Sequence, residues 1–452
     1  MSREGLSLLT HFERVVGMEV RPFRGTIEVP PDKSMSHRAL MLAAMADGAS
    51  ELSNLLDSQD VRSTAACLSA LGAKIEVTRR TGKSFDAHVE GWGRRGPSSP
   101  SAPLDCGNSG TTTRLLLGIL SSYDVTATLE GDASLSKRPM QRVTEPLSRM
   151  GACFNDADGQ PWSEGAITLP LTVQGTSTPS GIEFFNAKAS AQVKTALMLA
   201  GLRCSGEVVV TEPHRSRNHT ELMLPAFGVR VDVDGLTVRV KGGQKLHPCD
   251  VRVPGDPSSA MFLVVAAALT PGSDVTIRSI GLNPTRIAAI EAALRMGCDI
   301  AIEEGSPIGG EPVGDVRVRY TAGLAATEVT AEEVPALIDE IPVLALLAAS
   351  AQGTTVFHDV AELRVKESNR LRAVVEGLQA LGCQAREEGD DLVVEGGVPT
   401  EGIAIDPLGD HRLAMTWTLA NRCFGLPGTV ADESCIDVSY PGFMDDLYCL
   451  QL

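Results

Sequence analysis

Apolar residues along the chain gather into Ala- and Leu-rich runs that end at a glycine and are followed by a β-rich segment. In five places an apolar residue precedes this glycine, which fits a left-handed residue closing a helix. These places are Leu71-Gly72, Met150-Gly151, Phe227-Gly228, Met296-Gly297 and Leu381-Gly382. The pattern predicts an α/β protein made of repeated helix-then-strand units.

A second set of Ala- and Leu-rich helices is predicted between these, and each of its members begins at polar residues. Six of these starts recur at intervals of 68 to 81 residues, marked by Ser34, Ser109, Ser190, Ser258, Asp339 and Asp410. Any one of them alone would be explained as a helix N-cap, where Ser and Asp are favoured for stability. As a set they predict six two-helix units whose helix starts share a face. A chain of 452 residues is too long for one core, so three units in each of two domains is the expected division.

Helix starts that share a face suit anionic ligands, because each offers free N–H groups and the positive end of a dipole. The net charge of −17 and an aromatic content of only 4% argue against general nucleic-acid or membrane-surface binding. A locally basic cleft remains compatible with that charge. Basic residues do gather near the starts, together with two acidic ones: Lys33, Arg38, Arg138, Arg217, Lys366, Arg370 and Arg412, with Asp339 and Glu367. That composition indicates general acid–base chemistry on a phosphorylated carboxylate.

Other features of the sequence indicate the compartment in which the protein is expected. The first 21 residues lack a basic segment followed by an apolar one, and the longest apolar runs are too short to span a bilayer. The ten cysteines form no C-x-x-C pair. We therefore expect a cytoplasmic protein with reduced cysteines that mostly serve packing. Five of them fall in or near apolar patterns: Cys67, Cys153, Cys298, Cys383 and Cys423.

Simpler explanations stay open for several of these segments. The stretch around Gly110 is also compatible with a Gly-Ser turn, and the charged run Arg364–Arg370 with a solvated helix face held by local ion pairs. A zinc site at His214 and His219 is disfavoured, since their spacing does not match helical ligand spacing and no Cys pair accompanies them.

The motifs, in order from about Met18 to Met444, closely resemble those of the 5-enolpyruvylshikimate-3-phosphate synthase family. Three of them, Ser190–Lys194, Arg217–Glu221 and Asn283–Arg286, resemble its bacterial class II branch. The other matching stretches are Asp32-Lys33-Ser34 with His37-Arg38, Asn108–Thr111, Lys137-Arg138-Pro139, Asp256–Ser259, Ile338-Asp339-Glu340, Arg364–Arg370 and Asp410-His411-Arg412.

The resemblance implies an α/β fold of two similar domains, each built of three repeated βαβαββ-type units, with the active site in the cleft between them. This is the enolpyruvyl transferase, or inverse half-barrel, fold. The implied domains are 32–253, and 1–31 together with 254–452. The implied reaction transfers the enolpyruvyl group of phosphoenolpyruvate to the 5-hydroxyl of 3-phosphoshikimate by addition and elimination through a tetrahedral ketal. It requires no metal or organic cofactor, and the expected partners are these two small molecules, with no nucleic acid, no membrane and a monomeric chain.

The resemblance also implies roles for individual residues. Asp339 would take the proton of the 5-hydroxyl, Glu367 would exchange a proton with the methylene carbon, and Lys33 is the third implied catalytic residue. Phosphoenolpyruvate would contact Lys33, Gly110, Arg138, Gln192, Arg370 and Arg412. 3-Phosphoshikimate would contact Lys33, Ser34, Arg38, Ser190, Ala191, Gln192, Arg217, Asp339 and Lys366.

The chain departs from the family pattern at three points. Val438 stands where many members have a lysine that contacts phosphoenolpyruvate, and Leu115 stands where many have proline. No final helix-Gly-strand phrase precedes Leu452, so an abbreviated last repeat is expected. Gly110 favours inhibition by glyphosate, whereas Leu115 and Val438 oppose it, so we expect intermediate sensitivity.

Two alternatives remain at this point. UDP-N-acetylglucosamine enolpyruvyl transferases should show a Lys-Asn pair at the first helix start and a catalytic loop cysteine, but this chain has Lys33-Ser34 and no cysteine in Gly131–Arg142. A non-catalytic anion-binding protein would need neither Asp339 nor Glu367.

Overall fold

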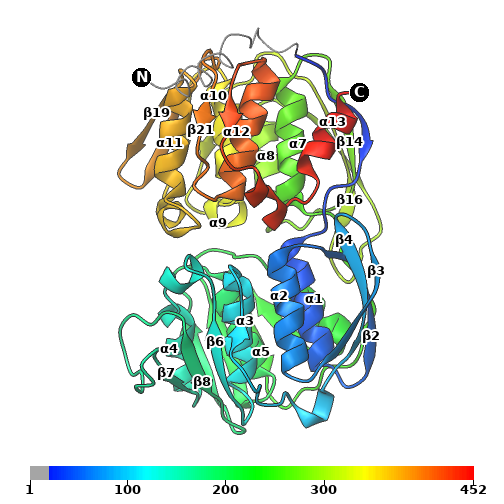
Figure 1. Ribbon diagram of the computed structural model, residues 1–452, viewed down its shortest axis with the longest axis vertical. Helices are drawn as coiled ribbons and strands as arrows, with labels where there is room; N and C mark the ends of the chain where they lie inside the picture. The colour runs from blue at the N-terminus through cyan, green and yellow to red at the C-terminus, as the bar shows by residue number, and fades with distance from the viewer. Residues whose placement is uncertain (1–19) are drawn as a thin grey trace, which may run out of the picture.

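The computed structural model describes residues 20–452, which form the two lobes seen one above the other in Figure 1. The first lobe contains helices α1–α6 and the second lobe contains α7–α13. Each lobe has its own hydrophobic core, one extending from Met35 to Val253 and the other from Phe23 and Val29 to Leu450. The expectations for residues 1–19 concern a segment outside the described residues.

The first lobe consists of three units, each with two helices on a four-stranded sheet. The first unit contains α1 (Lys33–Met45), β2 (Ala49–Leu56), α2 (Gln59–Ala70), β3 (Lys74–Arg80), β4 (Ser84–Glu90) and β13 (Val251–Arg252). The second contains β5 (Leu104–Asp105), α3 (Gly110–Leu120), β6 (Thr126–Glu130), α4 (Gln141–Arg149), β7 (Cys153–Asn155) and β8 (Leu171–Gln174). The third contains β9 (Ser180–Phe185), α5 (Ala191–Gly201), β10 (Ser205–Thr211), α6 (His219–Met223), β11 (Val231–Asp234) and β12 (Thr237–Lys241).

The second lobe repeats this arrangement. Its first unit contains β1 (Arg24–Ile27), α7 (Pro257–Leu269), β14 (Asp274–Gly281), α8 (Ala288–Arg295), β15 (Asp299–Glu304) and β16 (Val313–Arg319). Its second contains β17 (Glu328–Val329), α9 (Val334–Leu337), α10 (Ile341–Ala349), β18 (Thr354–Phe357), α11 (Arg370–Ala380), β19 (Gln384–Glu388) and β20 (Asp391–Glu395). Its third contains β21 (Ala404–Ile405), α12 (His411–Phe424), β22 (Thr429–Val430) and the terminal α13 (Phe443–Leu450). Short 3₁₀ turns are η1 (Gly93–Arg95), η2 (Leu135–Lys137), η3 (Leu224–Phe227), η4 (Ala361–Val365) and η5 (Ser434–Val438).

The four-stranded sheets share one topology. In β5-β6-β8-β7, for example, β5 runs parallel to β6, while β8 runs antiparallel to both β6 and β7. The same order recurs in five sheets, which confirms the predicted repeat of βαβαββ units. The sixth sheet has only β21 and β22, so the expected abbreviation of the last repeat is also confirmed.

The chain passes between the lobes twice. Strand β1, near the N-terminus, pairs in parallel with β14 of the second lobe, with Arg24 opposite Asp274. After the three units of the first lobe, β13 pairs in parallel with β2, and the chain then returns to the second lobe. The two crossing segments bond to each other, since the Asp32 amide donates to the Pro254 carbonyl and the Asp256 amide to the Pro30 carbonyl, both at 2.9 Å.

Local signals in the sequence account for the helix ends. The five glycines predicted to close helices all have positive φ, from 80° to 110°, as a left-handed residue requires. The predicted starts of α1 and α7 are confirmed, and their N-caps, Asp32 and Asp256, lie two residues before the markers Ser34 and Ser258. Each carboxylate accepts a hydrogen bond from a first-turn amide, of Met35 and Ser258 respectively.

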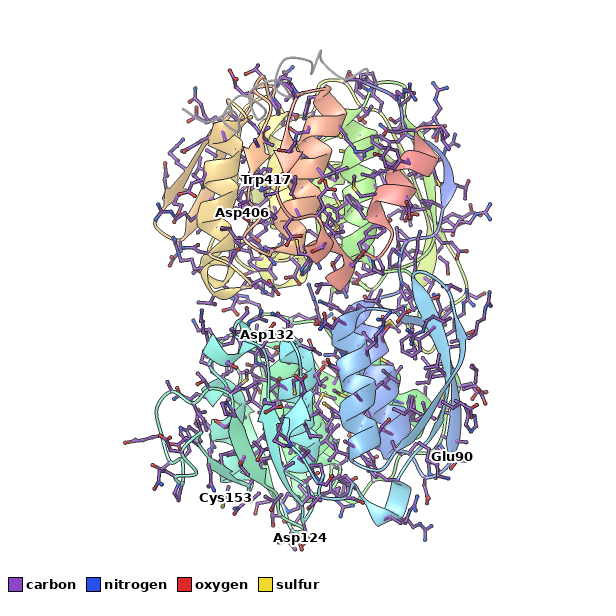
Figure 2. All side chains as sticks on the ribbon, viewed as in Figure 1. Glu90, Asp124, Asp132, Cys153, Asp406 and Trp417 are labelled. Carbon is purple, nitrogen blue, oxygen red and sulfur yellow. The ribbon has the colours of Figure 1, made fainter. Side chains whose placement is uncertain are left out.

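One helix of each unit is almost wholly buried, which explains the Ala- and Leu-rich runs. Helices α3 and α5 pack so closely at Gly118 that an added Cβ would lie 2.6 Å from the Ala196 Cα. Trp417, marked on α12 in Figure 2, is fully buried in the second core. Cys153 contradicts the packing expected of it, because it is exposed on β7 at the outer edge of the first lobe (Figure 2).

All ten cysteines lie within residues 20–452, and none of them forms a disulfide. Across the same residues, no helix combines the length and the apolar character that crossing a membrane would require.

Candidate active site

A cleft of about 520 Å³ lies between the lobes and is lined by residues from the start of the buried helix of each unit. The first lobe contributes the starts of α1, α3 and α5, and the second lobe those of α7, α10 and α12. Every residue predicted for the site lines this cleft: Lys33, Ser34, Arg38, Gly110, Arg138, Ser190, Ala191, Gln192, Arg217, Asp339, Lys366, Glu367, Arg370 and Arg412. The sixfold set of helix starts therefore converges on one place.

Arg38 is buried on α1, where it faces the start of α5. Its guanidinium donates to the Thr220 hydroxyl at 2.8 Å and the Thr195 hydroxyl at 3.0 Å. A third bond reaches the Ser34 carbonyl at 3.0 Å, so within residues 20–452 its hydrogen-bond partners are all neutral oxygens. Burial is the main reason that the pKa of Arg38 falls to about 10. A buried cation with neutral partners is well suited to an anionic ligand.

Lys33, at the first position of α1, connects the two lobes. Its ammonium lies 3.3 Å from the Asp60 carboxylate of α2, and its amide donates to Asp256 of the second lobe at 3.3 Å. The side chain keeps about a fifth of its surface exposed, on the side of the cleft.

The start of α5 is shaped by its loop. Ala189 has a φ of +45°, and the side-chain amide of Asn186 donates to the Ser190 carbonyl at 3.0 Å. The Ser190 side chain makes no cap hydrogen bond, so its hydroxyl is left for another partner. Gln192 donates to the Thr111 hydroxyl at 2.9 Å and accepts from Arg114 at 2.6 Å, which joins the starts of α3 and α5.

Three arginines gather beside Gly110 at the start of α3. Arg138 donates to Asn108 at 2.7 Å, and Asn108 in turn donates to Asp132, which Figure 2 marks on the edge of the first lobe that faces the second. Arg114 is buried, and this burial is the main reason that its pKa falls to about 9. The nearby charges of Arg142 and Arg138 lower the pKa further. A Cβ on Gly110 would lie 2.9 Å from an Arg114 nitrogen, so only glycine leaves this space open.

Arg114 and Arg142 were not among the predicted site residues, although both line the cleft. The sequence offered a signal for Arg114, since it follows the Asn108–Thr111 motif by one helical turn. Arg142 bonds across the cleft to Glu362 of η4 at 3.2 Å, and nothing in the sequence indicated this contact.

Asp339 lies just before α10, where three cations from two lobes surround it. Arg217 of the first lobe contacts one carboxylate oxygen at 2.7 Å, and Lys366 and Arg370 contact the other at 3.3 and 3.5 Å. Burial alone would raise its pKa, but Lys366 and Arg217 outweigh burial and hold the pKa of Asp339 well below its usual range. Asp339 is therefore an ionised carboxylate.

Glu367 belongs to the segment between η4 and α11. Its carboxylate accepts from Arg370 at 2.5 Å, and Arg370 also contacts Asp410, the N-cap of α12, at 2.9 Å. Burial opposes ionisation of Glu367, but Arg370 outweighs it and lowers the pKa of the carboxyl well below its usual range. The charged run is therefore not a solvated helix face, because it enters the cleft, while Arg364 turns away to pair with Glu387.

Arg412 and His411 begin α12 on the opposite wall. Arg412 lies 3.6 Å from Glu340, which accepts a hydrogen bond from Ser258 of α7. Burial lowers the pKa of His411 to about 3, with the charge of Lys33 adding to the effect, so its imidazole is neutral at physiological pH.

Five buried guanidinium nitrogens of these arginines make no hydrogen bond within residues 20–452. They are Nε of Arg114, Arg138 and Arg142, and Nη1 of Arg370 and Arg412, of which the last two lie 3.5 and 3.6 Å from the Asp339 and Glu340 carboxylates. Buried N–H groups without acceptors are rare in proteins. Their concentration in one cleft indicates a site built for a ligand with several anionic oxygens.

The surroundings of His219 and Val438 bear on two further points of the sequence. Both ring nitrogens of His219 are engaged, with Glu311 at 2.7 Å and Arg286 at 3.1 Å, so this ring offers no free ligand to zinc. In the described part of the chain no cluster of His, Cys, Asp and Glu could hold a metal ion. Val438 ends η5 and is not among the residues that line the cleft.

Comparison with known proteins agrees with this geometry. The family described as EPSP synthase (3-phosphoshikimate 1-carboxyvinyltransferase) matches residues 18–447. The 3-phosphoshikimate 1-carboxyvinyltransferase of Desulforamulus reducens is 46% identical over 428 residues, covering 95% of this chain and 97% of its own. That of Xanthomonas campestris is 46% identical over 421 residues, covering 93% of each chain.

Two solved structures are also similar. EPSP synthase from Acinetobacter baumannii superimposes with a TM-score of 0.85 at 36% identity, covering 97% of this chain and 98% of its own. The enolpyruvyl transferase NikO of Streptomyces tendae gives a TM-score of 0.71 at 19% identity, covering 96% of each chain, and shares the fold.

Proposed function

Because the chain belongs to the EPSP synthase family, we propose that the cleft between its lobes is the active site and that the residues described above divide the reaction among them. The enzyme transfers the enolpyruvyl group of phosphoenolpyruvate to the 5-hydroxyl of 3-phosphoshikimate and releases phosphate. The observation that carries the assignment of the site is the set of five buried guanidinium nitrogens that make no hydrogen bond within the described residues, in a cleft with two carboxylates.

3-Phosphoshikimate binds mainly to the first lobe in this proposal. Its phosphate lies among Ser190, Ala191, Gln192 and Arg217, where the Ser190 hydroxyl and the first amides of α5 are free to donate. The ring carboxylate and hydroxyls face Lys33, Ser34 and Arg38 of α1, with Asp339 and Lys366 meeting the ring from the second lobe.

Phosphoenolpyruvate binds between the lobes, at the arginines with free N–H groups. Arg138, Gly110 and Gln192 provide the first-lobe side, and Arg370 and Arg412 the second-lobe side, with Lys33 between them. We include Arg114 among the groups that neutralise this ligand, because it lies beside Arg138 and Gln192. Guanidinium pairs match the oxygens of carboxylate and phosphate in a bidentate geometry.

Asp339 accepts the proton of the attacking hydroxyl. Its ionised state suits a base, and Arg217 and Lys366 hold its two oxygens in place. Since Arg217 comes from the first lobe, the base is fully oriented only when the lobes approach each other.

Glu367 protonates the methylene carbon and later takes a proton back from the resulting methyl group. In the structure Arg370 keeps Glu367 ionised. When the anionic groups of phosphoenolpyruvate engage Arg370, they add negative charge beside Glu367 and compete for its cation. Both effects raise the pKa of Glu367 and favour the protonated acid that the first step needs.

The protons balance through these two residues. Glu367 gives a proton to the methylene carbon, C2 becomes electrophilic, and the hydroxyl oxygen bonds to it while its proton passes to Asp339. Elimination breaks the C–O bond to phosphate and returns a methyl proton to Glu367. The hydroxyl proton leaves with phosphate, so both carboxylates regain their starting states. The arginines stabilise the anionic ketal where it forms.

Closure of the lobes completes the site and excludes water, which could otherwise divert the activated group. The domains proposed to close are 32–253, and 1–31 together with 254–452, in accordance with the two separate cores. We also propose that the enzyme works as a monomer, since each of the proposed roles falls to a residue of this one chain. Cytoplasmic location remains part of the proposal, in keeping with the ten cysteines, none of which forms a disulfide within the described residues.

Purified protein should release inorganic phosphate from phosphoenolpyruvate only when 3-phosphoshikimate is also present. The reason is that the phosphate leaves from the ketal, which forms only after the hydroxyl attacks. A phosphate-release assay with each substrate omitted in turn tests this. Equal release without 3-phosphoshikimate would contradict the transfer reaction.

Glyphosate is expected to inhibit with intermediate strength. Gly110 leaves open the space beside Arg114 and Arg138 that an anionic analogue would use, whereas Val438 does not supply the cation found in many relatives. In the Gly110→Ala variant the Cβ should crowd Arg114, so that both the inhibition constant and the KM for phosphoenolpyruvate rise. A sub-micromolar inhibition constant in the unmodified enzyme would contradict the expectation.

A further inference from the structure

A buried polar cluster lies where the two lobes join, and two of its members, Asp256 and Arg286, also line the cleft. Its members come from both crossing segments, from the start of α6 and from the loops around α8. We call it the hinge cluster. It consists of Asp32, His219, Asp256, Asn283, Arg286 and Glu311.

Arg286 is the centre of the hinge cluster. One guanidinium nitrogen contacts Asp32 at 2.6 Å, and the other contacts Asp256 at 2.8 Å. Burial opposes the charge of Arg286, but Asp32 and Asp256 outweigh it and raise the pKa of its guanidinium. Because Asp32 caps α1 and Asp256 caps α7, one side chain joins the first helix of each lobe.

A second connection crosses between the lobes through His219. Arg286 donates to Nε2 of this ring at 3.1 Å, so Nδ1 carries the proton that it donates to Glu311 at 2.7 Å. The other oxygen of Glu311 accepts from Asn283 at 2.8 Å. Asn283 also donates to Asn218 at 2.8 Å, and Asn218 directly follows Arg217 of the proposed site.

A third connection leads from Arg286 into the second lobe. Its guanidinium donates to the Ser258 hydroxyl at 2.8 Å, and this hydroxyl donates to Glu340. Glu340 follows Asp339 in the chain and lies 3.6 Å from Arg412. The hinge cluster is therefore linked to three segments of the proposed site. These carry Arg217 of the 3-phosphoshikimate site, the base Asp339, and Arg412 of the phosphoenolpyruvate site.

We infer that Arg286 is a positioning residue that sets the angle at which the lobes close on their substrates. It acts by holding the caps of α1 and α7 together and by anchoring the start of α6 through His219 and Glu311. The inference rests on the proposed function of the cleft. It assigns a role to the Asn283–Arg286 segment and to Asp256, neither of which has one in the reaction itself.

Arg286→Lys tests the inference while keeping the positive charge that two buried carboxylates need. A lysine ammonium is a point charge that cannot hold Asp32, Asp256 and Ser258 in one planar geometry. We expect the dissociation constant of 3-phosphoshikimate, measured by titration calorimetry, to rise about tenfold or more. We expect kcat to fall as well. The matched control is Arg317→Lys, which alters an exposed arginine paired with Asp274 at 2.8 Å on the far side of the same lobe.

Glu311→Gln separates positioning from direct contact, because Glu311 does not line the cleft. The amide keeps the shape but offers one acceptor where His219 and Asn283 both need one. This variant should also bind 3-phosphoshikimate more weakly than the unmodified enzyme. Binding is measured at a temperature at which circular dichroism shows that the variant is fully folded.

Weakened binding in both folded variants supports the inference. Normal affinity in the folded Arg286→Lys protein, or in the folded Glu311→Gln protein, overturns it, whatever happens to their thermal midpoints. The unmodified enzyme serves as the separate test of the function, since it must bind 3-phosphoshikimate and release phosphate regardless of how the hinge behaves.

Discussion

Replacing Asp339 with asparagine is expected to lower kcat by roughly 10²- to 10⁴-fold, the usual contribution of a general base. The asparagine keeps the size of the side chain, and its one carbonyl oxygen can still accept from Arg217, which lies 2.7 Å from the carboxylate, while the contact with Lys366 is lost. It cannot take the hydroxyl proton. Both substrates should therefore bind while the hydroxyl remains unactivated, and steady-state phosphate release with calorimetric binding separates these two outcomes.

Asp359→Asn is the matched control for this variant. Asp359 is also an acidic residue of the second lobe that lines the cleft, but it is exposed. Its backbone has a φ of +50°, which asparagine tolerates as well as aspartate does. Its kcat should stay near that of the unmodified enzyme. A kcat within a few-fold of normal in Asp339→Asn would remove Asp339 from the role of base.

The convergence of the helix starts could be predicted because it follows from local rules and from repetition. Glycines such as Gly72 and Gly297 close helices by their own backbone freedom, with φ values of 103° and 89°. The first polar start, marked by Ser34, was also placed correctly, and its cap is Asp32 two residues earlier. Pro30 and Pro31 keep the backbone extended up to Asp32, whose φ and ψ of −60° and 119° let its side chain reach the first turn.

The connections between the lobes could not be predicted, because they join residues far apart in the sequence. Arg217 and Asp339 are 122 positions apart, and Arg286 and Asp32 are 254 apart. No periodicity links such pairs, and only the way the two lobes face each other brings them together. For the same reason the sequence assigned no role to the Asp256–Ser259 stretch, whereas Asp256 pairs with Arg286 and accepts from Lys33. The exposure of Cys153 likewise depends on β7 lying at the edge of its sheet.

Replacing Glu367 with glutamine is expected to lower kcat by a similar factor, roughly 10²- to 10⁴-fold, because the acid that protonates the methylene carbon is lost. The amide can still accept from Arg370, which lies 2.5 Å from the carboxylate, so the pocket should keep its shape. Glu362→Gln is the matched control. It alters an acidic residue of the preceding turn η4 that also bonds to an arginine, at 3.2 Å, but is 41% exposed. Loss of so exposed an ion pair should change the rate little.

The two carboxylates are distinguished by hydrogen exchange at carbon. In heavy water the unmodified enzyme forms a methyl group that contains one solvent-derived deuterium, so both the product and any phosphoenolpyruvate returned by reversal carry deuterium in the methylene group. Mass spectrometry should show this label, and it should disappear in Glu367→Gln. If Glu367→Gln still labels the methylene group at the normal rate, another acid protonates the carbon and Glu367 only holds Arg370. The exchange thus reports the chemistry at carbon separately from the rate, because it follows the bond that Glu367 makes and breaks rather than the release of phosphate.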